Sequence, residues 1–260
     1  MSEKQMLHFY SQQGEDIFIY KQLINKACPD GVFVEIGGYD GITYSNTKFF
    51  EDHLGFRGIL IEPTKYYENM KNNRPNCDCY NVAVGYTNEP ILFVGDNPCA
   101  GALETMSLDA IEYHHKTSDR YLVNADTFGN ILHKSSLKYV DLMSIDVEGG
   151  EYMVLITMDW TIPVYIIIIE CHLHDEEKNE LCRKLLIEKG FTFFKGFCAN
   201  EFWVNNNYFR KDLLYDKCIT ENIMEKHDLL FHFLANHCVK ESFIAVDDNY
   251  LLEKIMKNEE

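Results

Sequence analysis

Four side chains at the ends of two apolar runs are the strongest candidates for chemistry. Asp146 and Glu148 end one run, and Glu170 and His172 end the next. The carboxyl ends of parallel strands border the ligand crevice of an open α/β sheet, so these side chains are expected there. A hydroxyl nucleophile needs a general base or a metal ion that lowers its pKa. Asp146, Glu170 and His172 are therefore the predicted catalytic residues and the predicted ligands of Mg²⁺ or Mn²⁺.

Structural roles compete with this interpretation. Asp146 and Glu148 can cap a helix that begins near Gly149, because short acidic side chains accept hydrogen bonds from the first amides of a helix. Glu170 and His172 can lie on the surface or pack without a ligand. Metal binding is left open by the sequence.

A second candidate site is a glycine-rich turn. The residues from Val34 to Gly41 read VEIGGYDG, a strand-like run that enters a turn before a helix expected to begin near Ser45. Glycines let the backbone approach a ligand closely. Glu62 lies 21 residues after Gly41 and ends the second apolar run, where a carboxylate can accept both ribose hydroxyls of an adenosine. This combination predicts a nucleoside site.

Charge and spacing favour S-adenosylmethionine over a dinucleotide. The glycines are spaced G-G-x-x-G rather than G-x-G-x-x-G, and Glu35 and Asp40 would lie where a pyrophosphate passes. Two carboxylates repel phosphates and attract the ammonium and sulfonium groups of S-adenosylmethionine. The alternative, a structural turn with a surface acid, leaves the spacing of Glu62 unexplained.

The elements around these residues predict an α/β fold. Helical stretches alternate with apolar runs bounded by turn residues, and these runs are Val32–Gly37, Gly58–Pro63, Cys77–Val84, Val140–Val147 and Pro163–Cys171. This alternation predicts a doubly wound, mostly parallel sheet with helices on both faces. Two aromatic runs, Phe191–Phe197 and Glu201–Asn205, are expected to add a terminal hairpin and bring the sheet to seven strands.

Helices are expected outside the strands. The spacing of apolar residues predicts one helix over Glu15–Ala27 and another over His174–Lys189, which stops at Gly190. We expect residues 1–210 to form a Rossmann-like domain that includes the first helix. Residues 211–260 are expected to form a helical extension that acts as a lid or an interface, so a homo-oligomer is one of the expected arrangements.

The amino-acid composition limits the classes of binding partner and the expected location of the protein. The formal charge of −17, with no Lys/Arg cluster, disfavours nucleic acid and anionic lipid. No run approaches the roughly 18 apolar residues of a membrane span, and the first residues do not resemble a signal peptide. The expected location is the cytoplasm, that of the host cell for a viral protein. The nine cysteines are expected to be reduced, with Cys77 and Cys79 packed in the core rather than bound to zinc.

Several motifs resemble FkbM-family methyltransferases in order and spacing. They span Ser11 to about Trp203 and comprise Ser11–Asp16 (SQQGED), Phe33–Gly37 (FVEIG), Asp40–Gly41, Ser45–Thr47 (SNT), Gly58–Pro63 (GILIEP), and Ile145–Gly149 (IDVEG) with Glu151. The family usually has Asp and a Gly-Ala pair where this chain has Glu35 and Gly37-Gly38. These departures keep the charge and the backbone freedom.

The resemblance implies a class I, S-adenosylmethionine-dependent methyltransferase that methylates hydroxyl oxygens of sugars or related small molecules. It implies cofactor contacts from Gln13, Glu35, Gly37, Gly38, Asp40, Ser45, Asn46 and Glu62, and the topology adds Asn81 and Ala83 near the adenine. Catechol and macrolide-sugar methyltransferases of this fold hold Mg²⁺ at positions that match Asp146 and Glu170. An RNA or protein methyltransferase, and a binding protein that retains the fold without catalysis, are the alternatives.

Overall fold

The computed structural model describes residues 7–114, 116–172, 175–215 and 244–246. The chain forms two compact units. One comprises residues 1–31, 42–56 and 209–260, and the other comprises residues 32–41 and 57–208.

The larger unit contains the predicted seven-stranded sheet. Its strands are β2 (Val32–Ile36), β3 (Arg57–Ile61), β4 (Asp78–Tyr80), β10 (Val140–Ile145), β11 (Val164–Glu170), β12 (Thr192–Phe197) and β13 (Asn200–Val204). They are arranged in the order β12-β13-β11-β10-β2-β3-β4. The five strands from β4 to β11 are parallel, and β13 pairs antiparallel with both β11 and β12. The mostly parallel sheet and its terminal hairpin are confirmed.

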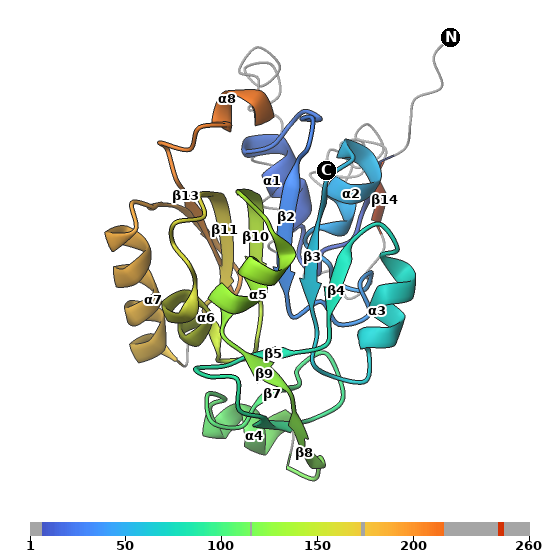
Figure 1. The fold of residues 1–260 in the computed structure, drawn as a ribbon, viewed down its shortest axis with the longest axis vertical. Helices are drawn as coiled ribbons and strands as arrows, with labels where there is room; N and C mark the ends of the chain where they lie inside the picture. Colours follow the sequence, from blue (N-terminus) through green and yellow to red (C-terminus); the bar gives the residue numbers. More distant parts are fainter. Residues whose placement is uncertain (1–6, 115, 173–174, 216–243, 247–260) are drawn as a thin grey trace, which may run out of the picture. The chain divides into compact units, whose positions relative to one another are not determined.

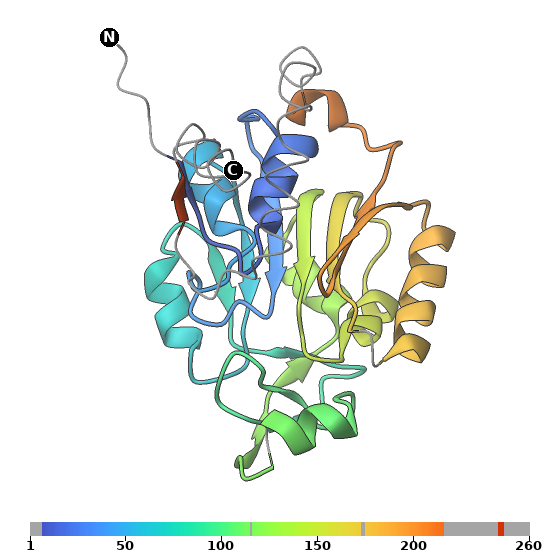
Figure 2. The ribbon, with the colours of Figure 1, turned by 180° about the vertical axis from the view of Figure 1, so that it is seen from behind.

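The central strands have no solvent-facing side. Every residue of β10 is buried, as are the first six residues of β11, because these strands are covered on both faces. The helices of this unit are α3 (Tyr67–Asn73), α4 (Leu108–His114), α5 (Phe128–Ser135), α6 (Glu151–Thr157) and α7 (Glu176–Glu188). Helix α6 packs against both α5 and α7, and Figures 1 and 2 show α5 and α6 on the same face of the sheet.

The predicted strand Cys77–Val84 is wrong as a single element. It divides into β4 and β5 (Ala83–Val84), and β5 pairs with β9 (Ala125–Asp126) in a separate sheet. The chain leaves the main sheet at Asn81, whose side-chain amide donates to the carbonyl of Glu62 at 2.9 Å. Cys77 and Cys79 are half-buried rather than core residues.

A further small sheet was not expected from the sequence. Strands β6 (Ile91–Val94), β7 (Gly101–Ala102) and β8 (Arg120–Val123) form an antiparallel sheet in the order β7-β6-β8. Figures 1 and 2 show both small sheets beyond the carboxyl ends of the main parallel strands. Their loops are therefore available to border a ligand site at that edge.

The other unit contains α1 (Glu15–Gln22), α2 (Lys48–Leu54) and α8 (Lys211–Leu214), and it pairs β1 (Leu7–Phe9) antiparallel with β14 (Ile244–Val246). Helix α1 is shorter than the predicted Glu15–Ala27, because the amides of Leu23 and Ile24 both donate to the carbonyl of Ile19 and the helical pattern ends there.

The predicted helical tail is only partly described. The described tail contains α8 and the strand β14, whereas residues 216–243 and 247–260 lie outside the described residues, as does His174, the predicted start of α7. The proposed division at residue 210 stays a prediction. Within the described part of the chain, no helix has the length and apolar character needed to span a membrane.

Candidate active site

Four adjacent strands end in register. Ile36 of β2 pairs with Ile61 of β3 and with Ile145 of β10, and Ile145 pairs with Ile169 of β11. The residues that come next are all predicted site residues, namely Gly37, Glu62, Asp146 and Glu170. The register of the sheet thus brings four positions that are distant in sequence to one edge.

Gly37 packs directly against the backbone that follows β10. Its φ is +89°, and a Cβ atom there would lie 1.8 Å from the carbonyl oxygen of Asp146. The amide of Asp146 donates to the carbonyl of Ile36 at 3.0 Å. Any other residue at position 37 would clash with backbone and be strained. Glycine is therefore needed here to join the turn to the acidic strand end, in addition to the cofactor role predicted for it.

The Glu62 carboxylate bridges two backbone segments. Oε2 accepts from the amide of Tyr39 at 2.9 Å, and Oε1 accepts from the amide of Thr64 at 2.7 Å. Glu62 is only 5% exposed, and burial raises its pKa. A carboxylate has about four acceptor positions, so further hydrogen bonds to a ligand are compatible with these contacts.

The Glu35 charge is compensated within the protein, which the sequence did not indicate. Arg74, at the end of α3, is fully buried, and its Nη1 lies 3.4 Å from Oε2 of Glu35. The same Nη1 donates to the carbonyl of Gly41 at 3.0 Å. Attraction of a cationic cofactor therefore depends on the other carboxylates at this edge.

The remaining predicted cofactor residues of this unit have varied surroundings. Gly38 is buried, and Asp40 is half-buried with its carbonyl accepting from Nδ2 of Asn73 at 2.8 Å. Asn81 is exposed at the end of β4 and holds the backbone of Glu62. Ala83 is buried in the small core under β5 and β6.

Gln13, Ser45 and Asn46 belong to the other compact unit. Ser45 is buried, and its Oγ accepts from the amide of Lys48 at 3.0 Å, which stabilises the start of α2. Asn46 is also buried. The amide of Gln13 donates to the carboxylate of Glu15 at 2.9 Å, in the turn before α1.

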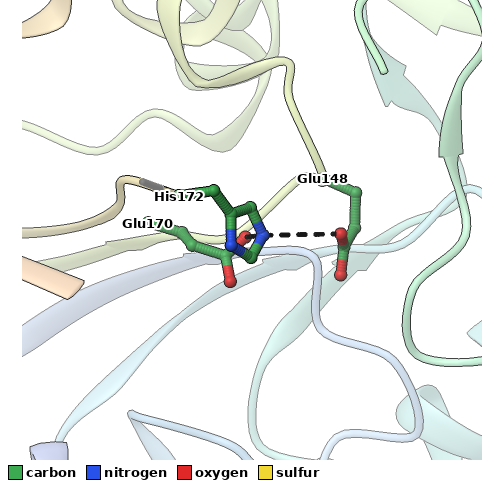
Figure 3. Close-up of side chains that lie close together, drawn as sticks. All are labelled: Glu148, Glu170 and His172. Carbon is green, nitrogen blue, oxygen red and sulfur yellow. Dashed lines mark ion pairs between the residues drawn. The ribbon is translucent and has the colours of Figure 1, made fainter. Parts of the chain in front are cut away.

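Glu148, Glu170 and His172 form a compact cluster (Figure 3). Nε2 of His172 lies 3.0 Å from Oε2 of Glu170 and 3.9 Å from Oε2 of Glu148. One ligand atom from each residue lies within 4.8 Å of the others, a spacing that a metal ion can bridge. The structure thus brings together two of the three predicted metal ligands. The third member of this group is Glu148, not the predicted Asp146.

The cluster has an excess of negative charge. Ion pairing with Glu148 and Glu170 raises the pKa of His172 to about 10, so its imidazole is protonated at neutral pH. Burial, followed by the charge of Glu148, raises the pKa of Glu170, although the nearby imidazolium opposes this shift. Oε2 of Glu170 is buried, and its approach to His172 lacks the geometry of a hydrogen bond.

Asp146 has the same electrostatic surroundings. Dense surrounding protein and then the charges of Glu170, Glu148 and Glu151 raise its pKa well above the ordinary value. Solvent nevertheless reaches Asp146, which is exposed at the sheet edge, so the neighbouring carboxylates contribute most to its raised pKa. A carboxylate with a raised pKa at a solvent-accessible edge is suited to accept a proton.

The loop between β6 and β7 borders this cluster, and the sequence did not predict it. A Cβ atom on Gly101, the residue of β7 that follows the loop, would lie 3.0 Å from Cβ of Glu148. Burial and the charges of Glu148, Asp146 and Glu170 raise the pKa of the half-buried Cys99 thiol to about 12.

The other end of this loop lines a polar cavity. Its volume is about 440 Å³, and its lining residues are Lys65, Gly95, Asp96, Thr117, Ser118, Asp119 and Tyr121. The Tyr121 hydroxyl donates to the carbonyl of Gly95 at 2.8 Å. Burial and then the charges of Glu62 and Asp96 raise the pKa of Tyr121 to about 12.

Comparisons with known proteins agree with this fold. The family model described as a methyltransferase FkbM domain matches residues 35–193, a range that includes Glu35, Glu62, the strand end at Asp146 and the cluster. A search of curated proteins finds no match.

One solved structure that aligns with the chain supports the fold. A methyltransferase FkbM from Methylobacillus flagellatus KT aligns with a TM-score of 0.50 and 11% identity, over 75% of this chain and 48% of that one. The chain thus spans about half the length of that protein. A precorrin-6y C5,15-methyltransferase from Geobacter metallireducens GS-15 aligns with a TM-score of 0.41 and 11% identity, over 78% of this chain and 91% of that one.

Proposed function

The chain belongs to the FkbM methyltransferase family, and we propose that it transfers the methyl group of S-adenosylmethionine to a hydroxyl oxygen of a sugar, a glycan or a related small molecule. The observation that carries the proposal is the shared sheet edge. The glycine turn, the Glu62 carboxylate and the carboxylate–histidine cluster all follow strands that end in register.

The turn and Glu62 are the proposed cofactor contacts. Amides of the turn and of Thr64 hold the Glu62 carboxylate, which orients it to accept the ribose hydroxyls. The acidic edge attracts the ammonium and sulfonium groups of the cofactor. This charge preference supports S-adenosylmethionine over a nucleotide with several phosphates.

The proposed reaction is a substitution at the methyl carbon. The acceptor oxygen forms a bond to this carbon as the carbon–sulfur bond breaks, and the bonding pair returns to sulfur, giving S-adenosylhomocysteine. The hydroxyl proton goes to Asp146, whose raised pKa makes its carboxylate a stronger base than that of an ordinary aspartate. His172 is protonated at that pH in this arrangement, which favours Asp146 over His172 as the base.

The polar cavity supports a neutral, hydroxyl-rich acceptor. Its volume of about 440 Å³ falls within the roughly 300–1,000 Å³ typical of small-molecule sites. Its lining offers hydroxyl and carboxylate groups that can hydrogen-bond sugar hydroxyls. Lys65 is already paired with Asp96 at 2.6 Å, so the cavity has little free positive charge to attract a phosphate.

A divalent ion is the second part of the proposal. Two carboxylates and an imidazole suit Mn²⁺ or Mg²⁺, and the buried Glu170 oxygen that makes no hydrogen bond is compatible with coordination. Glu148, Glu170 and His172 would hold the ion, with Asp146 beside them. When bound, the ion would lower the pKa of an acceptor hydroxyl.

An acceptor screen tests the proposal. The full-length protein would be incubated with cofactor labelled in the methyl group and with panels of free sugars, glycosides, capped RNA and peptides, with and without Mn²⁺. Label that enters a sugar or glycoside is the expected result. Label that enters only RNA or peptide would contradict the acceptor class, and tight cofactor binding with no transfer would indicate a binding protein.

A further inference from the structure

We propose that Glu151 and Lys178 are positioning residues that hold Glu148 in the carboxylate–histidine cluster. The inference rests on the proposed function, because it concerns the geometry of the same metal site. Neither residue belongs to the group of potential ligands. Their effect on Glu148 comes through the backbone of the turn that joins β10 to α6.

The backbone at Glu148 needs support. Its φ is +54°, in the left-handed region that residues other than glycine rarely adopt, and the following Gly149 has a φ of +107°. This conformation directs the Glu148 side chain toward His172, as Figure 3 shows. Contacts around the turn must therefore keep it from relaxing to a more common conformation.

The Glu151 carboxylate supplies that support. Oε1 accepts from the amide of Val147 at 3.3 Å and from the amide of Gly149 at 3.1 Å. These are the amides of the residues on either side of Glu148. One buried oxygen therefore binds the turn on both sides of its strained residue, and Glu151 itself is fully buried.

Lys178 pairs with the Glu151 carboxylate. Its Nζ lies 2.5 Å from Oε2 of Glu151, and its side chain is only 10% exposed. A buried carboxylate without a partner would be destabilising, and the lysine supplies the opposite charge beside it. Lys178 comes from α7, so this pair joins the turn after β10 to the helix after β11.

The same part of α7 also fixes His172. Nδ2 of Asn179 donates to the carbonyl of His172 at 2.8 Å, and the amide of Asp175 donates to that carbonyl at 3.0 Å. Neighbouring residues at the start of α7 therefore hold both sides of the cluster. Groups that orient metal ligands in this way commonly change metal affinity by roughly 10- to 100-fold when they are removed.

The experiment compares two affinities in one set of variants. Mn²⁺ and S-adenosylmethionine binding to the full-length protein would each be measured by calorimetry for the parent, Glu151→Gln, and the double variant Glu151→Gln/Lys178→Met. The double variant removes both charges, which avoids the buried unpaired carboxylate that Lys178→Met alone would leave. Thermal unfolding would be recorded for each protein.

Arg183→Met is the matched control. Arg183 lies on the same helix and pairs with Glu201 of β13 at 2.7 Å. The substitution therefore removes an ion pair of α7 whose partner is on β13 and not on the turn. We expect Mn²⁺ affinity to fall by roughly 10-fold or more in both Glu151 variants, with cofactor affinity within about twofold of the parent. The control should change neither affinity.

Three results would overturn the inference. Mn²⁺ binding in the Glu151 variants equal to that of the parent would show that Glu148 does not depend on Glu151. An equal fall in both affinities would indicate a general structural role. A parent protein that binds no Mn²⁺ would refute the metal proposal itself and the role of Glu151 in it, and this outcome is distinguished by the parent measurement alone.

Discussion

Replacement of Glu62 by alanine tests the placement of the cofactor. The carboxylate is 5% exposed and accepts from two backbone amides, those of Tyr39 and Thr64. We expect Glu62→Ala to remove charge-assisted hydrogen bonds to the ribose and weaken S-adenosylmethionine binding by about 2–3 kcal/mol, or about 30- to 140-fold in Kd. Calorimetric titration of the cofactor measures this change directly.

The same substitution has a cost in stability that must be separated from binding. It leaves two amides without their acceptor, at about 1–3 kcal/mol for each one that water does not reach. Asp141→Ala is the matched control, because Asp141 is fully buried and accepts from the amide of Val32 at 2.9 Å and from the hydroxyl of Tyr208 at 2.8 Å.

Asp141 lies near the amino end of β10, away from the strand ends that carry the site. The control should therefore lose a similar amount of stability in urea unfolding and keep the parent affinity for the cofactor. If folded Glu62→Ala binds the cofactor within threefold of the parent, Glu62 is not a ribose ligand. If the control loses affinity equally, the effect of Glu62→Ala is one of stability.

Three further predictions concern Asp146, the proposed metal ion and the nearby Cys99. Asp146→Asn should lower kcat by about 10²-fold or more and leave cofactor Kd within a few fold, because a base acts mainly in the transition state. An unchanged kcat would exclude Asp146 as the base. Excess chelator should abolish turnover and Mn²⁺ or Mg²⁺ should restore it, whereas full activity in chelator would refute the metal proposal. In metal-free protein at pH 8, iodoacetamide should modify Cys99 about 10³-fold more slowly than an ordinary thiol, because its pKa of about 12 leaves little thiolate. Mass spectrometry with the exposed Cys198 as internal reference measures that rate, and comparable rates would contradict the shift.

The parts of the site that follow strands could be predicted from the sequence. Apolar runs identify parallel strands, and parallel strands bring their carboxyl ends to one edge. That rule alone places Glu62, Asp146 and Glu170 at one edge. The strands that carry Asp146 and Glu170 are adjacent, and β2 lies between the strand that carries Asp146 and the strand that carries Glu62. The terminal hairpin was also predictable, because its two aromatic runs are separated by a short turn.

The remaining parts depend on contacts that no local pattern specifies. The Arg74 side chain reaches Glu35 from a helix 39 residues later in the chain, and Cys99 reaches the cluster on a loop between two very short strands. The break at Asn81 was missed because the apolar run continues through it, although the hydrogen bonds change from one sheet to another. Glu148 entered the cluster because of its left-handed backbone, which sequence periodicity does not show.

Charge balance separates structural from functional carboxylates at this edge. Two buried acids each have a basic partner on a helix: Arg74 pairs with Glu35, and Lys178 pairs with Glu151. Among the described residues no Lys or Arg pairs with the other four, which are Glu62, Asp146, Glu148 and Glu170. His172 pairs with Glu148 and Glu170. Burial and then the charges of neighbouring carboxylates raise the pKa of Asp146 and of Glu170, and this repulsion destabilises the ligand-free fold. A cationic cofactor, a divalent ion or a transferred proton would relieve this repulsion, so the acids without basic partners are the ones on which binding and catalysis should depend.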